Sequence, residues 1–353
     1  MKIIWMLDNI NTMNGMVRVV IGLSNYFTEK GNEVEIVSFY SNRTTPFFSL
    51  RPDVRVRNLG KDWSKLTRSD KHQLLGDLMQ TSDADIMLTC NEWANSSSVL
   101  HKRKFAGKLI VTQHMSCDGF TRRRRVLNAV LHRFADKVAV LTEADSAFYK
   151  KFGVQNVTVI PNAVYTETVD ISNKQNIICA AGRFDHQKGF DLLIQAFAKV
   201  AEKMPDWKLR ILGDGSQRAN LLNQVNELGL SHQIEMPGMS NAIAEEFARS
   251  SIYVLSSRHE GFGLTLVEAM HAGNAIVAFD LPCVRDILTS ESAIIVPPEN
   301  AEALAAALYE MVCNTDFRVS SSLAAHAKAQ EYTIENIGDK WLRLFDSLLG
   351  SNQ

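Results

Sequence analysis

The stretch HEGFGLTLVEAMHAG places two glutamates, Glu260 and Glu268, eight positions apart around a phenylalanine between two glycines. The apolar run before it predicts a short buried strand, and LTLVEAMHA predicts a helix. The first amides of such a helix are unpaired and attract anions, most obviously a phosphate. We therefore predict a ligand loop in which Glu260 faces the reacting end of the ligand and Glu268 accepts hydrogen bonds from hydroxyls. The alternative is an ordinary helix start with two solvated carboxylates.

Two cations stand at a second predicted strand end, in AAGRFDHQKGFDLL. Arg183 and Lys188 bracket the turn into the next helix, and such a pair suits a diphosphate, with the arginine as a planar fork and the lysine as a mobile charge. Two solvated surface charges are the alternative. Gly213, in RILGDGSQ, lies in a further glycine-rich turn that turn chemistry alone explains. The GxGxxG fingerprint of dinucleotide-binding proteins is absent, which argues against an NAD-dependent enzyme.

The first half of the chain offers weaker candidates. Asn14 and Gly15 follow the first predicted strand and could bind sugar hydroxyls or phosphate, although Asn-Gly is also a common turn. His114 ends an apolar strand in IVTQHMSCDG, and we expect it to point toward a cleft between domains, although a lone histidine is more often structural. Asp118 is a candidate partner carboxylate or a helix cap.

Composition limits the classes of protein. The chain has 353 residues, enough for two domains, and its 46% hydrophobic and 22% charged residues with a net charge of -1 are typical of a soluble globular protein without a nucleic-acid partner. Five scattered cysteines without CxxC spacing predict neither a disulfide framework nor a zinc site. The amino-terminal apolar run is too short for a signal peptide, and no run reaches the roughly 18 residues of a membrane span. We therefore expect a cytoplasmic protein.

Strand-like and helix-like segments alternate along the whole chain, which predicts an α/β architecture of parallel sheets covered by helices. The pattern is interrupted once, by a polar segment at residues 162–174 that we predict to be a linker. We place an amino-terminal domain at 1–164 and a carboxyl-terminal domain at 165–335. Residues 336–353 read as an amphipathic helix, expected to pack back on the first domain.

Four motifs, in this order along the chain, resemble the second domain of GT-B glycosyltransferases of the large retaining family four: AAGRFDHQKGFDLL, RILGDGS, SSRHEGFGLTLVEAMHAGNAIVAFD and IIVPPENAEALAAAL. The resemblance is dense over residues 176–311 and thinner, but consistent, in the first half. Its most specific element is the pair Glu260 and Glu268, separated by seven residues as in that family. The implied fold is GT-B, with two Rossmann-like, doubly wound parallel-sheet domains facing a cleft. The resemblance implies that residues 1–164 form the acceptor-side domain and residues 165–335 the nucleotide-sugar-binding domain. Many members carry two adjacent glycines where this chain has Asn14 and Gly15.

The resemblance also implies roles for individual residues. Arg183 and Lys188 would bind the diphosphate of a nucleotide-sugar, and Glu268 would accept the ribose hydroxyls. Glu260, with the amides of the three residues after it, would hold the donor sugar, and His114 would stand beside that sugar, which makes these two the candidate catalytic residues. The full donor-binding set is Arg183, Lys188, Gly213, Gly261, Phe262, Gly263, Leu264 and Glu268, with Asn14 and Gly15 as an acceptor or phosphate loop.

The implied activity is transfer of a sugar from a nucleotide-diphosphate sugar, a UDP-sugar, to a glycan, lipid-linked or protein acceptor with retention of anomeric configuration, in the synthesis of cell-surface polysaccharide or glycoconjugate. Cations and helix amides would stabilise the leaving diphosphate. No aspartate-rich DxD stands at a strand end, so Arg183 and Lys188 make a metal unnecessary, and no cofactor is expected. A two-step covalent mechanism needs a carboxylate beneath the anomeric carbon, and the sequence nominates none. The resemblance implies instead that the departing phosphate takes the acceptor's proton.

Two other classes of protein remain open. A sugar-nucleotide epimerase of GT-B architecture would use the same donor cleft, but it needs acid and base carboxylates around the sugar, for which the sequence offers only Glu260 and Asp118. A non-catalytic sugar-nucleotide-binding subunit would lack part of the arginine, lysine and glutamate set, and this chain has all of it.

The segments HKRKFAGK and TRRRRVLNAVLHRF are strongly basic, with Asp118 as the one acidic residue between them. They read either as a solvated face or as a patch for an anionic membrane, through Arg122, Arg123, Arg124 and Arg125, which would place the protein at the inner face of the membrane. The apolar residues at helical spacing after the arginines are membrane-facing or core. These are Val126, Leu127, Val130, Leu131 and Phe134.

Overall fold

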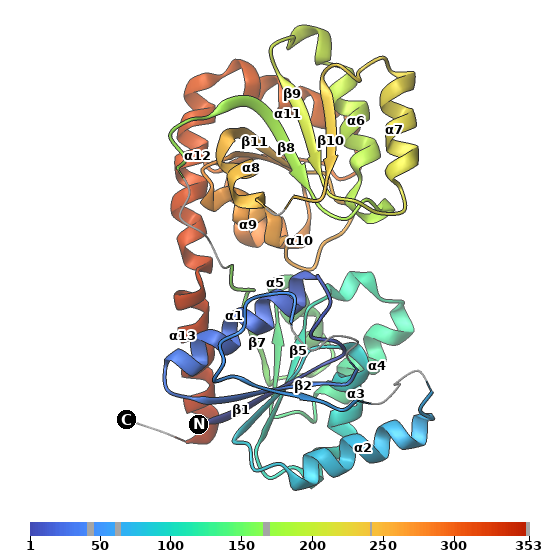
Figure 1. The fold of residues 1–353 in the computed structure, drawn as a ribbon, viewed down its shortest axis with the longest axis vertical. Helices are drawn as coiled ribbons and strands as arrows, with labels where there is room; N and C mark the ends of the chain where they lie inside the picture. Colours follow the sequence, from blue (N-terminus) through green and yellow to red (C-terminus); the bar gives the residue numbers. More distant parts are fainter. Residues whose placement is uncertain (41–45, 61–64, 165–169, 241, 351–353) are drawn as a thin grey trace. The chain divides into compact units, whose positions relative to one another are not determined.

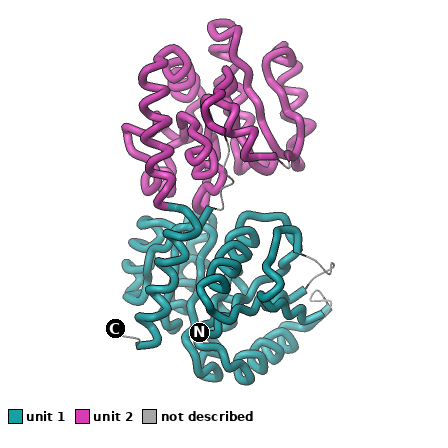
Figure 2. Tube along the Cα trace, turned by 60° about the vertical axis from the view of Figure 1, so that its left-hand side comes forward, with its two compact units in different colours: residues 1–165, 332–353 teal, residues 166–331 magenta. Residues whose placement is uncertain are grey.

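The computed structural model describes residues 1–40, 46–60, 65–164, 170–240 and 242–350. They form two compact units, residues 1–165 with 332–353 and residues 166–331 (Figure 2). Part of the predicted linker, residues 165–169, lies outside the described residues.

The first unit is built on a parallel sheet in the order β3-β2-β1-β4-β5-β6-β7 (Figure 1). Its strands are β1 Lys2–Leu7, β2 Glu33–Ser38, β3 Arg55–Asn58, β4 Ile86–Thr89, β5 Lys108–Gln113, β6 Lys137–Val140 and β7 Val157–Val159. Its helices are α1 Gly15–Glu29, α2 Arg68–Thr81, α3 Glu92–His101, α4 Arg122–His132, α5 Glu143–Lys151 and α13 Ile334–Leu349. The central strands are continuous apolar runs because helices cover both faces of a parallel sheet.

Helix α13, from the end of the chain, packs in the first unit. The ring of Trp341 meets Trp5 of β1 edge-on at 6.2 Å, and Phe345 meets Phe27 of α1 at 5.4 Å. The Tyr26 hydroxyl donates to Asp339 at 2.6 Å. Since aromatic pairs bury large apolar areas, these contacts fix α13 against α1 and the sheet.

The second unit has a parallel sheet in the order β10-β9-β8-β11-β12-β13. Its strands are β8 Gln175–Ala181, β9 Lys208–Leu212, β10 Ile234–Gly238, β11 Ser250–Leu255, β12 Ala275–Phe279 and β13 Ala293–Val296. Its helices are α6 Phe190–Ala198, α7 Arg218–Glu227, α8 Ile243–Arg249, α9 Leu264–His271, α10 Pro282–Ile287, α11 Ala301–Cys313 and α12 Thr315–Ala329. Figure 1 shows helices on both faces of this sheet.

The strand order reverses once in each sheet, between β1 and β4 and between β8 and β11. At such a switch point the loops after two neighbouring strands diverge to opposite faces of the sheet and leave room for a ligand at the carboxyl edge. In the second unit these two loops carry the residues that the sequence nominated, Arg183 and Lys188 after β8 and Glu260 after β11. The doubly wound parallel architecture predicted from the sequence is thus confirmed.

Candidate active site

The two loops at the second switch point are joined by an ion pair. The Lys188 ammonium lies 2.5 Å from a carboxylate oxygen of Glu260, and the Ser257 hydroxyl donates to the same oxygen at 2.8 Å. The lysine side chain is 19% exposed and the glutamate side chain 9%. Neither charge is well hydrated, so each depends on the other for compensation. The structure thus brings together two residues that were predicted from separate motifs.

Local geometry brings these loops close. Asp185 caps the short 3₁₀ helix η3, His186–Lys188, by accepting from the Lys188 amide at 3.2 Å. Gly189 follows with φ +62°, and a Cβ on it would lie 2.1 Å from the carbonyl oxygen of Ser256. Only glycine allows this approach of two backbones. The Ser256 hydroxyl, which donates to the Lys188 carbonyl at 3.0 Å, completes the junction.

Arg183 differs from Lys188 although both follow β8. Its side chain is 75% exposed, and its Nε donates to Asp185 at 2.6 Å. The two terminal guanidinium nitrogens donate to no residue within the described parts of the chain. The two terminal nitrogens of Arg183 are therefore available to a phosphate, whereas the Lys188 ammonium is already paired with Glu260.

Gly213 occupies the end of β9, on the other side of β8. It has φ +140°, and a Cβ there would lie 1.9 Å from the carbonyl oxygen of Gly182. The residue therefore has a packing role beside the loop that carries Arg183. Contact with a donor stays a prediction for Gly213.

The amino terminus of α9 faces the same edge of the sheet. Gly263 enters the helix with φ +87° and without a side-chain cap, after Phe262, which is 4% exposed. The amides of Leu264 and Thr265 donate to no described residue. Because unpaired amides at a helix start attract anions, this end of α9 is suited to phosphate or to a sugar hydroxyl oxygen. Glu268 is half-buried on the next turn of the helix.

Two residues of this site, Ser257 and Arg258, are not predicted from the sequence, although they lie in the loop that carries Glu260. Ser257 bonds the catalytic candidate Glu260, and Arg258 makes several hydrogen bonds to neighbouring loops. Their one sequence signal is position, since Ser257 ends the predicted strand segment and Arg258 follows it, just before Glu260.

His114 follows β5 in the first unit and lines a small cavity with Trp5, Asn162 and Trp341. Both of its ring nitrogens are inaccessible to solvent and make no hydrogen bond of good geometry with a described residue. Burial lowers the pKa of His114 to about 4, an effect that the Asn162 side chain opposes. The imidazole is therefore neutral near pH 7, so it can exchange hydrogen bonds but does not hold a proton to give away.

Asn14 and Asp118 have structural partners. The Asn14 carboxamide oxygen accepts from the Val17 amide at 2.9 Å and so caps α1, and its nitrogen donates to Thr12 at 3.0 Å. Asp118 pairs with Arg125 at 3.0 Å. The helix-cap interpretation of Asp118 is wrong, because Thr121 caps the helix that follows. Binding of acceptor or phosphate at Asn14 and Gly15 stays a prediction.

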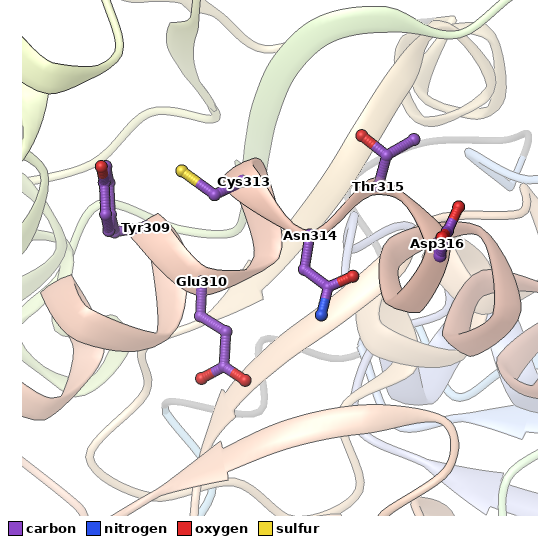
Figure 3. Close-up of a pocket in the computed structure, with 6 residues that line it drawn as sticks. All are labelled: Tyr309, Glu310, Cys313, Asn314, Thr315 and Asp316. Carbon is purple, nitrogen blue, oxygen red and sulfur yellow. The ribbon is translucent and has the colours of Figure 1, made fainter.

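The second unit has a hollow where α11 meets α12 (Figure 3). Its lining residues are Tyr309, Glu310, Cys313, Asn314, Thr315 and Asp316. They include two carboxylates and no cation, which does not suit a diphosphate. Among the described residues, no three histidine, cysteine, aspartate or glutamate side chains are grouped so that they could hold a metal ion.

Two family models match the chain in adjacent segments. Glycosyl transferases group 1 matches residues 165–328, which contain the ion pair and α9, and Glycosyltransferase Family 4 matches residues 13–168. This chain belongs to the group 1 glycosyltransferases. The glycosyltransferase has relatives of nearly equal length, so the match extends over both units.

One such relative is an uncharacterized glycosyltransferase of Haemophilus influenzae, 28% identical over 96% of this chain and 98% of the relative. Another is the amylovoran biosynthesis glycosyltransferase AmsD of Erwinia amylovora, 25% identical with the same coverage. Among solved structures, Anabaena HepE in complex with UDP and glucose is similar over 99% of this glycosyltransferase and all of that chain, with a TM-score of 0.82 and 19% identity. Its fold, and therefore that of this glycosyltransferase, is GT-B.

Proposed function

We propose that this glycosyltransferase moves a sugar from a UDP-sugar to a glycan or lipid-linked acceptor, with retention of anomeric configuration. One observation carries the proposal. At the switch point of the second unit, a largely buried Lys188–Glu260 pair joins the loop that carries the exposed Arg183 to the loop that leads into α9, whose first amides have no partner among the described residues. This is the charge distribution that a sugar diphosphate needs, with cations for the phosphates and an acceptor for sugar hydroxyls.

The ion pair suggests how donor binding begins. When a diphosphate reaches the loop after β8, Lys188 exchanges its bond with Glu260 for one with a phosphate oxygen. Glu260 is then released to accept a hydrogen bond from a hydroxyl of the donor sugar. As the bond between the anomeric carbon and the phosphate oxygen breaks, Arg183 and Lys188 stabilise the charge on the leaving diphosphate. The departing phosphate takes the proton of the acceptor hydroxyl, which attacks the same face.

The names of relatives support the substrate class. AmsD of Erwinia amylovora is named for amylovoran biosynthesis. A Campylobacter jejuni relative, 23% identical over 98% of this chain, is named as an N-acetylgalactosaminyltransferase that extends a glycan on PP-undecaprenol. We propose by analogy that this glycosyltransferase acts in the synthesis of a cell-surface polysaccharide or glycoconjugate.

The product decides this proposal. The purified protein, UDP-glucose, UDP-galactose and their N-acetyl analogues, and a panel of short glycan and prenyl-diphosphate-linked acceptors should give one glycoside, whose anomeric proton coupling by NMR matches that of the donor. An inverted product would contradict retention. Epimerised UDP-sugar formed without any acceptor would instead support the epimerase alternative.

A membrane contact through α4 is the second part of the proposal. Arg122, Arg123 and Arg133 are exposed on or next to this helix, and none forms an ion pair with a described residue. Arg124 and Arg125 pair with carboxylates, Glu92 and Asp118. No acidic residue occurs between Gly119 and Ala135. The face is therefore basic and complementary to an anionic lipid surface.

Three of the five apolar side chains that follow the arginines are exposed, and Val126 and Leu131 are half-buried. Leu127 is 51% exposed, Val130 39% and Phe134 58%. Leu127 and Val130, three positions apart, lie on one side of α4, and Phe134 follows in the turn directly after the helix. Within the described residues, no helix is both long and apolar enough to cross a bilayer. A basic helix with an apolar stripe is the pattern of interfacial binding, in which the stripe enters the lipid headgroup region.

Vesicle sedimentation tests the contact. The wild-type protein should sediment with phosphatidylglycerol vesicles at low salt and be released as salt rises, and Leu127→Ser with Phe134→Ser should lose this binding. The matched control is Val319→Ser with Leu323→Ser, two similarly exposed side chains on α12. No sedimentation of the wild type at low salt would favour the solvated-face alternative.

A further inference from the structure

Arg258 connects three loops of the second unit. Its terminal nitrogens donate to both carboxylate oxygens of Asp191, at 2.9 and 2.8 Å, and one of them also donates to the His186 carbonyl at 2.8 Å. Its Nε donates to Glu299 at 3.0 Å. These partners follow β8 and β13, whereas Arg258 itself follows β11. A single side chain thus joins the loops at three strand ends.

Main-chain bonds around Arg258 align the residues next to the Lys188–Glu260 pair. The Arg258 amide donates to the Gln187 carbonyl at 2.8 Å, and the Gln187 side chain donates to the His259 carbonyl at 2.9 Å. Each of these residues is within two positions of Lys188 or Glu260. Any displacement of Arg258 is therefore transmitted to the ion pair through the chain itself.

The interactions of Arg258 are those of a buried, preorganised group. Its side chain is 12% exposed. Burial raises the pKa of Asp191, but the hydrogen bonds and charge of Arg258 outweigh it, so the pKa of Asp191 lies below its usual value. Glu299 is the one non-glycine residue in the described parts of the chain with a positive φ, +57°, a conformation that persists only where contacts hold it.

The guanidinium of Arg258 has little capacity left for a ligand. It has five N–H donors, and the bonds to Asp191, His186 and Glu299 use four of them. Arg183, by contrast, keeps both terminal nitrogens free of described partners. The two arginines therefore have different functions, although both flank the same switch point.

We propose that Arg258 is a positioning residue for the donor site. It fixes the loops after β8 and β11 so that Lys188 and Glu260 meet in the geometry that a sugar diphosphate requires, and it does not contact the donor itself. This inference rests on the proposed function of the site.

Lysine in place of arginine tests the inference, because it keeps the charge and loses the bidentate fork. Arg258→Lys should lower kcat/KM for the donor by on the order of tenfold to a hundredfold, the scale of a small misplacement of reacting groups. Calorimetry should give a matching loss of UDP affinity. When Arg258→Lys is combined with Lys188→Ala, the UDP affinity should be little lower than in Lys188→Ala alone, because Arg258 acts on UDP binding through that lysine.

The matched control is Arg210→Lys. Arg210 is 18% exposed, is bidentate to Glu246 at 2.8 and 3.2 Å, and also pairs with Glu235, within β9 and away from the site loops. Both lysine variants should lower the melting temperature, but only Arg258→Lys should change UDP affinity and kcat/KM. Equal UDP affinity and kcat/KM in the two variants would overturn the positioning role and leave the proposed function intact. A wild type that binds no UDP would instead overturn the proposed function.

Discussion

The candidate site residues at the carboxyl edges of the two sheets in this glycosyltransferase differ in charge. In the second unit, the switch point holds the Lys188–Glu260 pair with an exposed Arg183 beside it. In the first unit, Asn14 is occupied as a helix cap and His114 is neutral. Of the candidate site residues, the cations that can bind a diphosphate therefore lie in the second unit. Asn14 and His114 of the first unit are uncharged near pH 7 and suit the hydroxyls of a sugar.

Of the substitutions that test this difference between the units, Glu260→Gln should have the largest effect on activity. Turnover should fall by about 10²–10³, the scale seen when a group that interacts with the reacting part of a substrate is removed. Affinity for free UDP should not fall, because UDP carries no sugar and the substitution releases Lys188 for phosphate. Steady-state kinetics and UDP calorimetry measure the two effects separately. Normal turnover in this variant would remove Glu260 from the catalytic candidates.

Lys188→Ala and Arg183→Ala should differ in stability. Removing the lysine leaves the Glu260 carboxylate, 9% exposed, without its cation, so the free energy of unfolding should fall by about 1–3 kcal/mol. Removing Arg183, 75% exposed, should change it by less than about 0.5 kcal/mol. Chemical denaturation of both variants checks the difference, and equal losses would show that the two cations are not distinguished by burial.

His114 should affect stability in a defined pH window. Its pKa falls from near 6.5 to about 4 on folding, so between these values the unfolded chain binds a proton that the folded unit does not. The free energy of unfolding should fall as pH drops through this window, by at most about 1.4 kcal/mol per pH unit for His114. His114→Gln should remove the contribution of His114 to this pH dependence of the free energy of unfolding. The contributions of His132 and His271, whose pKa values are also lowered to about 4, should remain.

The same variant tests the chemical role of the histidine. Because His114 stays neutral above about pH 5, the rate of the wild type and of His114→Gln should share the same pH profile between pH 5 and 8. A limb near pH 6 or 7 that disappears in the variant would show that His114 transfers protons.

Asn14→Ala should have the smallest effect. Loss of a helix cap costs about 1 kcal/mol of stability, and Asn14→Ser, which retains a capping oxygen, should recover most of it. Donor KM should be unchanged in both variants. A donor KM that rises in Asn14→Ala and not in Asn14→Ser would assign this loop to the donor site.

The sequence predicts the alternation of strands and helices well because apolar periodicity is strong in buried parallel sheets. It misses β3, whose four residues Arg55–Asn58 are all exposed, and α12, Thr315–Ala329, in which serines and alanines weaken the apolar stripe. Both elements form through pairing with neighbours, β3 with β2 and α12 with α9 and β12. Such tertiary contacts leave little signal in local sequence.

The site shows the same limit. The carboxylates and cations of the second unit stand out by residue type and by their position at predicted strand ends. Arg258 does not, because its importance depends on contacts with residues far away in sequence, such as Asp191. Ser257 bonds Glu260 only three positions on, but a serine at a strand end has no distinctive residue type. The apolar residues of α4 could be assigned to core or surface only once their exposure was known.

The most direct test of the central claim, that Lys188 of the second switch point binds the donor diphosphate, is calorimetry of UDP with Lys188→Ala. Its control is Lys208→Ala. Lys208 lies on β9 of the same unit, and its ammonium is 2.9 Å from the carboxylate of Glu235. Lys188→Ala should weaken UDP binding by about 1–3 kcal/mol, the value of a charge-assisted hydrogen bond, and Lys208→Ala should bind UDP like the wild type. Equal UDP affinity in Lys188→Ala and the wild type would contradict the claim.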